Sequence, residues 1–405
     1  MSNATSNIRG ACPTLATPLQ TGDGLLARIV SNEPIAVEKL RVLCDAAEAH
    51  GNGIIEITQR GSLQVRGLTA ASAPNFSAIV KSFGIGTDNT PPLLTSPLLS
   101  LDAGESFDST PLVAQLRTAL RADRPDFQGL GPKVSVLVDG GGNLHLDSLS
   151  ADIRVEATSN FLYELSLAGD AQSASFVGYV SMNRVVACVE DLLRLIASWG
   201  PTARARDVVA GLRWGKAQET ARPACEPIGA FPLKDGTFAI GFALAFGHTT
   251  APAMRRFALS AAELGAQAIR ATYGRALLAI GLSFAAAEQL RDRTAKLGFI
   301  VDSSDPRRHV VACAGSPACA SAKMATRELA PEVARAARLF VGTSNVVHLS
   351  GCSKGCAHPG PAAVTIVGPD RVVVNGRASD TPRATVSSAG LIVDIERLCM
   401  KIRHG

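Results

Sequence analysis

The chain has 405 residues, 46% of them apolar and 19% charged, a composition that excludes a disordered chain. Its net charge of +5 is spread along the chain without a basic run, and aromatic residues make up only 5%. A dedicated nucleic-acid-binding protein usually carries a basic stripe with interleaved aromatic residues, so we expect no nucleic-acid partner. At about 150 residues per domain, the length predicts two or three domains.

The first 85 residues predict alternating strands and helices. Residues 24–30 are short and apolar, which indicates a strand, and residues 35–50 carry apolar side chains at helical spacing. Residues 54–58 and 63–67 predict two short strands around a turn, and residues 71–83 predict a second helix that ends at Gly84.

A second segment repeats this pattern 214 positions later. The segment that begins at Ile54 aligns with the one that begins at Ala268, and Thr58 then meets Thr272 while Gly67 meets Gly281. The alternative is a chance likeness between two α+β segments, but the shared glycines and the near-constant offset favour an internal duplication.

Each repeat continues into a second piece with strands and flanking helices. Residues 133–147 and 363–376 each predict a strand, a turn and a strand, so Asp139–Asn143 is interpreted as a hairpin turn. The expected helices are 111–122, 190–199, 328–340 and 391–402, and the connector between the repeats is 200–227. We therefore expect four segments: 1–85, 86–210, 211–300 and 301–405.

The sequence predicts no membrane association. The most apolar uncharged stretch, 236–254, contains three glycines and a proline and is interpreted as a buried strand followed by a loop. The opening residues MSNATSNIRGACP contain no apolar region of a signal peptide, so we expect a cytoplasmic protein.

Four of the nine cysteines fall within 44 residues. Cys313 and Cys319 form a Cys-x5-Cys pair, and Cys352 and Cys356 form a Cys-x3-Cys pair. Structural zinc sites favour tighter pairs, whereas thiolates at this wider spacing suit the corners of a 4Fe–4S cluster. A zinc site, or buried thiols and disulfides, are the alternatives.

These motifs resemble those of the sulfite/nitrite reductase superfamily. The segments ACAGSPAC and SGCSKGC are similar to its cluster motif, and TQRGSLQVRG is similar to its tetrapyrrole-contacting strand. The resemblance implies an internally duplicated α+β fold with half-ferredoxin-like pieces and two α/β modules, one of which carries the cluster. Cys313, Cys319, Cys352 and Cys356 would hold the cluster.

The resemblance also implies residues that face a tetrapyrrole. They are Arg60, Gln64, Arg66 and Lys133, with Lys354 as a further cation near the cluster. Positions 60, 64 and 66 share parity, so a strand would point them to one face, and arginine binds carboxylates with two parallel hydrogen bonds. The structural alternative for the arginines is an exposed strand face, and for His358 a packed position beside the cluster.

Departures from the reductases bear on the reaction. Ser135 stands where the reductases carry a second lysine, and residues 86–98 lack the usual Arg-Asn. The segments RGACPTLATPLQTGDGLLARI, GPKVSVLVDGGG and CSKGCAHP are most similar to the branch that oxidises the tetrapyrrole precorrin-3A with dioxygen in aerobic cobalamin biosynthesis. Reduction of nitrite or sulfite on sirohaem is the alternative function, and a non-catalytic iron–sulfur electron carrier is a third.

The same branch implies a mononuclear non-haem iron in addition to the cluster. The histidines show no metal-ligand spacing, so the sequence identifies no ligands for it. No Gly-x-Gly-x-x-Gly follows a strand in the manner of a dinucleotide-binding fold. Electrons from NADH are therefore expected to arrive through a separate reductase or a ferredoxin.

Overall fold

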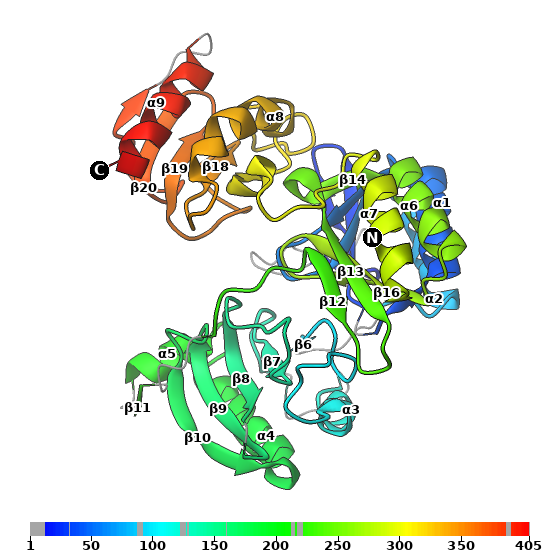
Figure 1. Cartoon of the computed structure of the whole chain (residues 1–405). Helices are drawn as coiled ribbons and strands as arrows, with labels where there is room; N and C mark the ends of the chain where they lie inside the picture. The colour runs from blue at the N-terminus through cyan, green and yellow to red at the C-terminus, as the bar shows by residue number, and fades with distance from the viewer. Residues whose placement is uncertain are drawn as a thin grey trace, which may run out of the picture.

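The computed structural model describes residues 13–404, apart from 32, 87–91, 122–126, 128, 159, 212–214, 217–221 and 386–389. These gaps include parts of the predicted 86–98 segment and of the predicted 200–227 connector. The described residues form four sheets. Two of them pack together on the right of Figure 1, and the other two stand apart at the top and the bottom of that view.

The paired sheets belong to two half-domains built alike. In the first half-domain the strand order is β1-β2-β5-β4-β14, with bounds Leu19–Thr21, Gly24–Ile29, Leu63–Leu68, Ile54–Ile57 and His248–Thr250. In the second it is β12-β13-β16-β15-β3, with bounds Gly229–Pro232, Phe238–Ala243, Ala276–Leu282, Ala268–Thr272 and Ile35–Ala36. Helices α1 (Val37–His50) and α2 (Ala73–Ser82) accompany the first sheet, and α6 (Ala251–Glu263) and α7 (Phe284–Ala295) the second.

The two half-domains exchange one short strand each. Strand β14 pairs with β4, so that Thr249 lies opposite Ile55, and β3 pairs with β15, so that Ile35 lies opposite Ile269. Both pairs are related by the same offset of 214 residues. This reciprocal pairing confirms the predicted duplication, because a chance likeness would not reproduce the register of the exchanged strands.

One hydrophobic core joins the half-domains. It contains Ile55 and Phe76 from the first half-domain and Phe242 and Phe257 from the second, and each of these residues is 0% exposed. Burial of a large apolar side chain contributes about 1.5–3 kcal/mol. The two half-domains are therefore stabilised as one body, and the face that each sheet turns away from this core is free to line a site.

The first module contains a six-stranded sheet. Its order is β11-β10-β9-β8-β7-β6, with bounds Gly215–Lys216, Ser175–Ser181, Leu162–Gly169, Ala151–Ala157, Val136–Asp139 and Leu93–Thr95. Helices α3 (Thr110–Ala119), α4 (Met182–Ser198) and α5 (Ala205–Gly211) accompany it. Helix α4 begins eight residues before the predicted start at 190, because its first turns are rich in valine and resemble a strand.

The second module repeats this topology with five strands. Its order is β17-β18-β19-β20-β21, with bounds Val310–Ala312, Val347–Ser350, Ala362–Val367, Arg371–Gly376 and Ala384–Thr385. Its helices are α8 (Thr326–Ala337) and α9 (Leu391–His404), and three short 3-10 turns are η2 (Ala245–Gly247), η3 (Pro306–His309) and η4 (Arg338–Phe340). In both modules the first three strands are parallel and the next is antiparallel.

The predicted hairpin at 133–147 is wrong. Residues 143–147 form no strand, and β7 instead pairs in parallel with β8, which begins at Ala151. Parallel strands need a longer connection than a tight turn, so Asp139–Asn143 opens a loop rather than closing a hairpin. The predicted hairpin at 363–376 is confirmed as β19 and β20, and its counterpart in the first module is β8 and β9.

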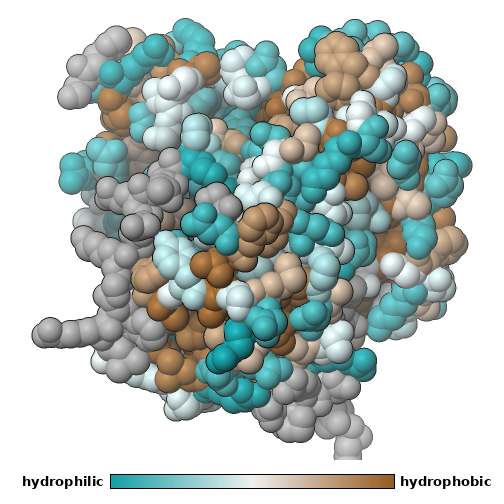
Figure 2. Space-filling view, turned by 60° about the horizontal axis from the view of Figure 1, so that its bottom comes forward, coloured by the Kyte–Doolittle hydropathy of each residue, from teal (hydrophilic) through white to brown (hydrophobic). Residues whose placement is uncertain are grey.

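No helix among the described residues is long and apolar enough to cross a membrane. The predicted strand within 236–254 is β13, but the expected loop after it contains β14 and the start of α6. Figure 2 shows hydrophilic and hydrophobic residues interspersed over one face of the molecule.

Candidate functional site

The four clustered cysteines lie at one edge of the second module. Cys313 directly follows β17, and Cys352 follows β18 by two residues. Because β17 and β18 are parallel, their carboxyl ends meet at the same edge of the sheet, and the Cys313 amide donates a hydrogen bond of 3.1 Å to the Leu349 carbonyl. Cys319 and Cys356 lie further along the same two loops.

The backbone shapes these loops around the thiols. Gly315 has φ +69° and its Cα lies against Thr326, where a Cβ would come within 2.4 Å of the Thr326 hydroxyl. The Gly351 amide donates to the Cys313 Sγ over 3.2 Å. Lys354 donates to the Ser321 hydroxyl over 3.0 Å and so joins the two cysteine loops. An amide aimed at a sulfur is the contact that stabilises a cluster thiolate.

The spacing of the thiols tests which metal group they fit. Burial raises the pKa of the Cys356 thiol, and the neighbouring thiolates of Cys352, Cys313 and Cys319 raise it further. Among the described residues, no three thiols have sulfurs that all lie within 4.8 Å of one another. A tetrahedral zinc ion with bonds of about 2.3 Å would hold its sulfurs about 3.8 Å apart. Four thiols that interact electrostatically at wider spacing fit a cubane of iron and sulfide.

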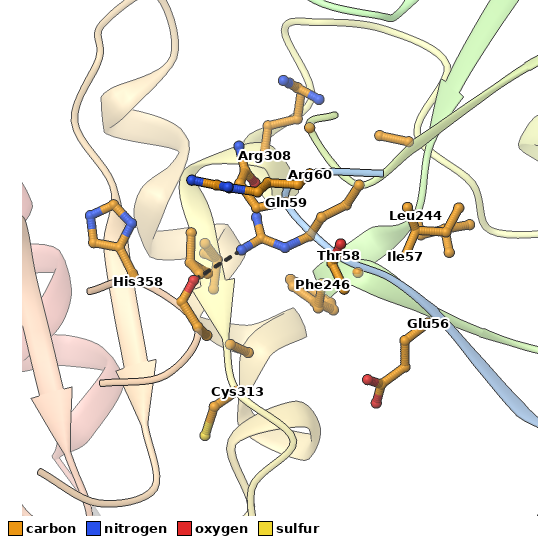
Figure 3. Close-up of a pocket in the computed structure, with 18 of the residues that line it drawn as sticks. Glu56, Ile57, Thr58, Gln59, Arg60, Leu244, Phe246, Arg308, Cys313 and His358 are labelled. Atoms are coloured by element: carbon orange, nitrogen blue, oxygen red, sulfur yellow. Dashed lines mark hydrogen bonds between the residues drawn. The ribbon is translucent and has the colours of Figure 1, made fainter. Parts of the chain in front are cut away.

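A cavity of about 860 Å³ adjoins this edge. Cys313 and Cys356 line it from the second module, Arg60 and Gln64 from the first half-domain, and Leu149 from the first module. Figure 3 shows side chains from these separate parts, among them Arg60, Arg308 and His358, converging on it. A broad ligand in the large cavity would therefore contact both half-domains, both modules and two of the four thiols.

The floor of the large cavity includes a polar row across the first sheet. Strand register places Arg28 opposite Gln64, Gln64 opposite Glu56, and Glu56 opposite His248. The first three line the cavity, while the alternate residues of the same strands lie in the shared core. The strand alternation thus turns one face of the sheet to the core and the other to the large cavity.

The large cavity is rich in arginine. Six line it: Arg28, Arg60, Arg275, Arg307, Arg308 and Arg327. Arg308 pairs with Glu226 at 2.6 Å, and Arg327 pairs with Glu56. Burial, and then the charge of Arg308, lower the pKa of Arg275 to about 10, and Arg275 donates to the Ala357 carbonyl beside Cys356 over 3.3 Å. Such a lining suits a ligand that carries several carboxylates.

The three predicted residues of the TQRGSLQVRG motif lie in three different environments. Arg60 lies in the turn before β5, where its Nη2 donates to the Ser150 carbonyl over 2.7 Å. Because it is outside the strand, the alternation of side chains along β5 does not determine its direction. Gln64 lies on β5 and lines the cavity. Arg66 is buried and outside the cavity lining, with two hydrogen bonds to Asp23, at 2.8 and 2.9 Å, and one to the Ala318 carbonyl at 2.7 Å.

Arg66 therefore positions the cluster loop rather than lining the cavity. Ala318 immediately precedes Cys319, so the guanidinium connects β5 to this loop. Burial raises the pKa of Asp23, but the hydrogen bonds from Arg66 and Thr21 outweigh it and hold that pKa below its usual value. The pair is ionised at neutral pH and holds the second module against the first half-domain.

The two predicted lysines lie outside the lining of the large cavity. Lys133 is exposed in the turn before β7, and Lys354 is exposed between Cys352 and Cys356. These exposed positions do not favour the expected contact of either lysine with a tetrapyrrole. Ser135, which stands in place of the reductases' second lysine, receives a hydrogen bond from Arg60 at 3.4 Å.

Sequence reasoning missed Arg28, Arg275 and Arg308. Arg28 is the charged residue within the apolar strand GLLARI, and its period-2 position opposite Gln64 was an available signal. Arg275 lies in the turn between β15 and β16, which corresponds to the turn that holds Arg60 in the first half-domain. The duplication thus could have indicated Arg275.

One further group of potential ligands lies in the first module. Asp139, His145 and Asp147 have ligand atoms within 4.8 Å of one another. Arg222 pairs with both carboxylates, His145 Nδ1 lies 3.1 Å from Asp147, and His145 Nε2 lies 2.9 Å from the Pro223 carbonyl. The group does not line the large cavity. Its donor atoms are engaged within the protein, so it does not fit a mononuclear iron that acts on a ligand there.

Comparison with known proteins agrees with this fold. A family model described as the nitrite/sulfite reductase ferredoxin-like half domain matches residues 25–83. A ferredoxin–nitrite reductase from Synechococcus elongatus is 23% identical, with 82% of this chain and 73% of that protein covered. The solved structure of the NirA protein of Mycobacterium tuberculosis matches with a TM-score of 0.76 at 18% identity, covering 94% of this chain and 81% of that one.

The fold and the four-cysteine edge define an oxidoreductase with the sulfite/nitrite reductase-like fold. A precorrin-3B synthase from Sinorhizobium is 38% identical over 412 residues, which cover 98% of this chain and 89% of that protein. The chain belongs to the precorrin-3B synthase family. The branch that the sequence motifs indicated is therefore confirmed, and the nitrite reductases are more distant relatives.

Proposed function

We propose that the protein catalyses the oxygen-dependent conversion of the tetrapyrrole precorrin-3A to precorrin-3B in aerobic cobalamin biosynthesis. The single observation that carries this is the 860 Å³ cavity, lined by arginines and bounded by Cys313 and Cys356. In the reaction one oxygen atom enters a ring carbon as a hydroxyl group, and a peripheral acid side chain closes a lactone. The second oxygen atom leaves as water after taking up two electrons and two protons.

The large cavity would hold the tetrapyrrole by its acid side chains. Arg60 extends into it from the first half-domain and Arg308 from the turn before β17 of the second module, and Gln64 offers an amide between Arg28 and Glu56. Guanidinium groups bind carboxylates with two parallel hydrogen bonds and so fix the orientation of the ring. Phe246 and Leu244 line the same cavity and offer apolar contact to the ring itself.

Cys313, Cys319, Cys352 and Cys356 would hold a 4Fe–4S cluster at the edge of the large cavity. Such a cluster would supply one-electron transfer chemistry. The Gly351 amide and the Arg66–Asp23 pair would keep the cysteine loops in place. An external donor, NADH through a reductase or a ferredoxin, would deliver the electrons to a cytoplasmic enzyme. The family also implies a mononuclear iron, to which we assign no residue and no step.

A reductase of nitrite or sulfite on sirohaem is the second candidate. The observation that favours it is that Cys356 lines the large cavity, where its thiolate would be available as a ligand for a sirohaem bound there. Against it, the exposed Lys133 and the substituted Ser135 leave Arg60 as the one reductase-type cation in the cavity among the matched positions that the structure describes.

Anaerobic incubation with precorrin-3A followed by admission of dioxygen tests the proposal. We expect a product heavier by one oxygen atom, detected by mass spectrometry, with the label retained when the gas is ¹⁸O₂. A protein purified with sirohaem absorption bands, which reduces nitrite or sulfite and leaves precorrin-3A unchanged, would establish the second candidate instead.

A further inference from the structure

A second, smaller cavity of about 60 Å³ adjoins the large one. The two share Arg28, Arg60 and Leu149 in their linings. The small cavity adds Arg270 from β15 and hydroxyl groups from Ser31, Ser62, Thr95 and Thr272. Its lining among the described residues contains three guanidinium groups and no carboxylate. Since a water molecule takes up about 30 Å³ of liquid, the space suits a group of a few heavy atoms.

Arg270 is buried without a carboxylate against it. Its side chain belongs to a residue that is 9% exposed, and its Nη2 donates to the Thr95 hydroxyl over 2.6 Å. Within the described residues neither Arg270 nor Arg28 forms an ion pair within 4.0 Å, and the buried Nε of Arg28 has no hydrogen-bond acceptor. Burial lowers the pKa of Arg270 to about 10, and Glu33, whose charge opposes this, is itself paired with Arg117.

Comparison of the two repeats shows that they carry opposite charges at the position of Arg270. Arg270 and Glu56 occupy equivalent positions, 214 residues apart, opposite Leu278 and Gln64 in their respective sheets. Glu56 is paired with Arg66 and Arg327, whereas Arg270 faces two further guanidinium groups. A buried guanidinium is costly unless an anion neutralises it. The described residues that line this space supply hydroxyl groups to orient an anion but no carboxylate.

We propose that the small cavity binds one carboxylate of the tetrapyrrole, held between Arg270 and Arg28 and anchored at its mouth by Arg60. This inference rests on the proposed function and names the part of the cavity that fixes the ring's rotation. A carboxylate on a short arm matches the volume, and the shared lining gives it access from the large cavity. The alternative source of the same chemistry is a free oxyanion such as phosphate.

Anaerobic absorbance titration of the holoprotein with precorrin-3A tests the inference. Arg270→Met removes the buried charge, and Ser31→Asp adds a carboxylate to the small cavity while keeping all three arginines. We expect both to raise the dissociation constant at least about tenfold, the scale for one charge-assisted hydrogen bond. Ser31→Asp should also raise the melting temperature, because it neutralises the arginines. Arg293→Met, an exposed arginine paired with Glu263, is the control and should bind as the wild type does.

The outcomes separate the inference from the proposed function. Wild-type protein that does not bind precorrin-3A defeats the proposed function and this inference with it. Wild-type binding that both variants retain defeats the inference alone. When the titration is repeated in saturating inorganic phosphate, we expect the wild type to bind precorrin-3A more weakly. If phosphate leaves tetrapyrrole binding unchanged, and phosphate itself binds in a way that Arg270→Met abolishes, the small cavity binds a free oxyanion. That result would overturn the proposal that it binds a carboxylate of the tetrapyrrole.

Discussion

The two modules share one backbone arrangement and differ in the chemistry of the same edge. In the second module the Cys313 amide donates to the Leu349 carbonyl over 3.1 Å, and the Gly351 amide donates to the Cys313 Sγ over 3.2 Å. In the first, the Ser96 amide donates to the Val138 carbonyl over 3.2 Å, and the Gly140 amide donates to the Ser96 Oγ over 3.1 Å. Ser96 thus occupies the position that Cys313 holds in the second module.

The other side chains at this edge also differ between the two modules. Where the second module gathers four thiols, the first gathers Asp139, His145 and Asp147 around Arg222. Ion pairs within the protein close this edge, whereas the thiols of the other edge are the ligands that we propose for a cluster. The comparison shows that the two modules keep the same backbone hydrogen bonds at this edge while their side chains differ in chemistry.

The largest effect is expected from Cys352→Ser. Loss of one thiolate should abolish the cluster, because a hydroxyl is a poor ligand for iron in a cubane. Iron and acid-labile sulfide per chain, with the visible absorbance, measure this. Cys188→Ser, a half-buried cysteine of the first module, is the matched control and should keep the full content. Full iron and sulfide in Cys352→Ser would refute the assignment of this edge.

Asp139→Asn tests the role of the corresponding edge in the first module. Asp139 is 0% exposed and accepts hydrogen bonds from the Leu146 amide at 2.6 Å, the Gly141 amide at 2.8 Å and Arg222 at 2.9 Å. Breaking a buried ion pair costs about 3–5 kcal/mol, so the first module should lose stability by about that amount. Urea unfolding followed by the fluorescence of Trp199 measures it, with the exposed Asp235→Asn as the control. Loss of iron at unchanged stability would instead make this edge a metal site.

Arg60→Ala should weaken the binding of precorrin-3A by about 1–3 kcal/mol, the scale of a lost charge-assisted hydrogen bond. Anaerobic absorbance titration measures the change. Arg60→Lys should restore part of the affinity, since a point charge remains without the planar fork. Arg256→Ala, on the exposed face of α6, is the control. Unchanged affinity of Arg60→Ala would remove this residue from the site.

The last prediction concerns how the stability of the fold depends on pH. Burial lowers the pKa of His145, but its contacts with Asp147, Cys225 and the Pro223 carbonyl outweigh this and raise that pKa to about 10. The pair therefore stabilises the fold fully below pH of about 6.5, the unfolded value, and loses its contribution as pH rises towards 10. The slope is at most about 1.4 kcal/mol per pH unit, the limit for one proton.

Urea unfolding at several pH values, compared with His145→Gln, measures this contribution. The wild type should lose its stability advantage between pH 7 and pH 10. On the acid side the lowered pKa of Asp147 removes its contribution only as pH falls below the usual value of about 4. A wild-type advantage that grows with pH would contradict the ionised pair.

Local pattern was sufficient for most elements of the half-domains. Apolar spacing and Gly84 predicted α2, and the 214-residue offset predicted β15, β16 and α7 from the first repeat. It was not sufficient for β7 and β8, because Gly-rich residues between apolar segments suit a hairpin and a parallel crossover equally well. Pairing of β14 with β4 joins residues almost 200 positions apart, which no local signal indicates.

The candidate site divides in the same way. The cysteine spacing indicated that the four thiols gather at one edge, because two loops suffice to bring them together, and their role as cluster ligands stays a prediction. The motif around Arg60 named Arg66 as a ligand contact, whereas Asp23 and the Ala318 carbonyl engage it. Arg270 could not be predicted from its own segment, because its surroundings come from β2, β6 and the turn before β5.

Iron-edge anomalous scattering from crystals of the anaerobically purified protein tests the central claim most directly. The account predicts a compact peak of four irons enclosed by Cys313, Cys319, Cys352 and Cys356, beside the large cavity, with no iron between Asp139, His145 and Asp147. A lone zinc among the cysteines, or iron between the aspartates and the histidine, would contradict it.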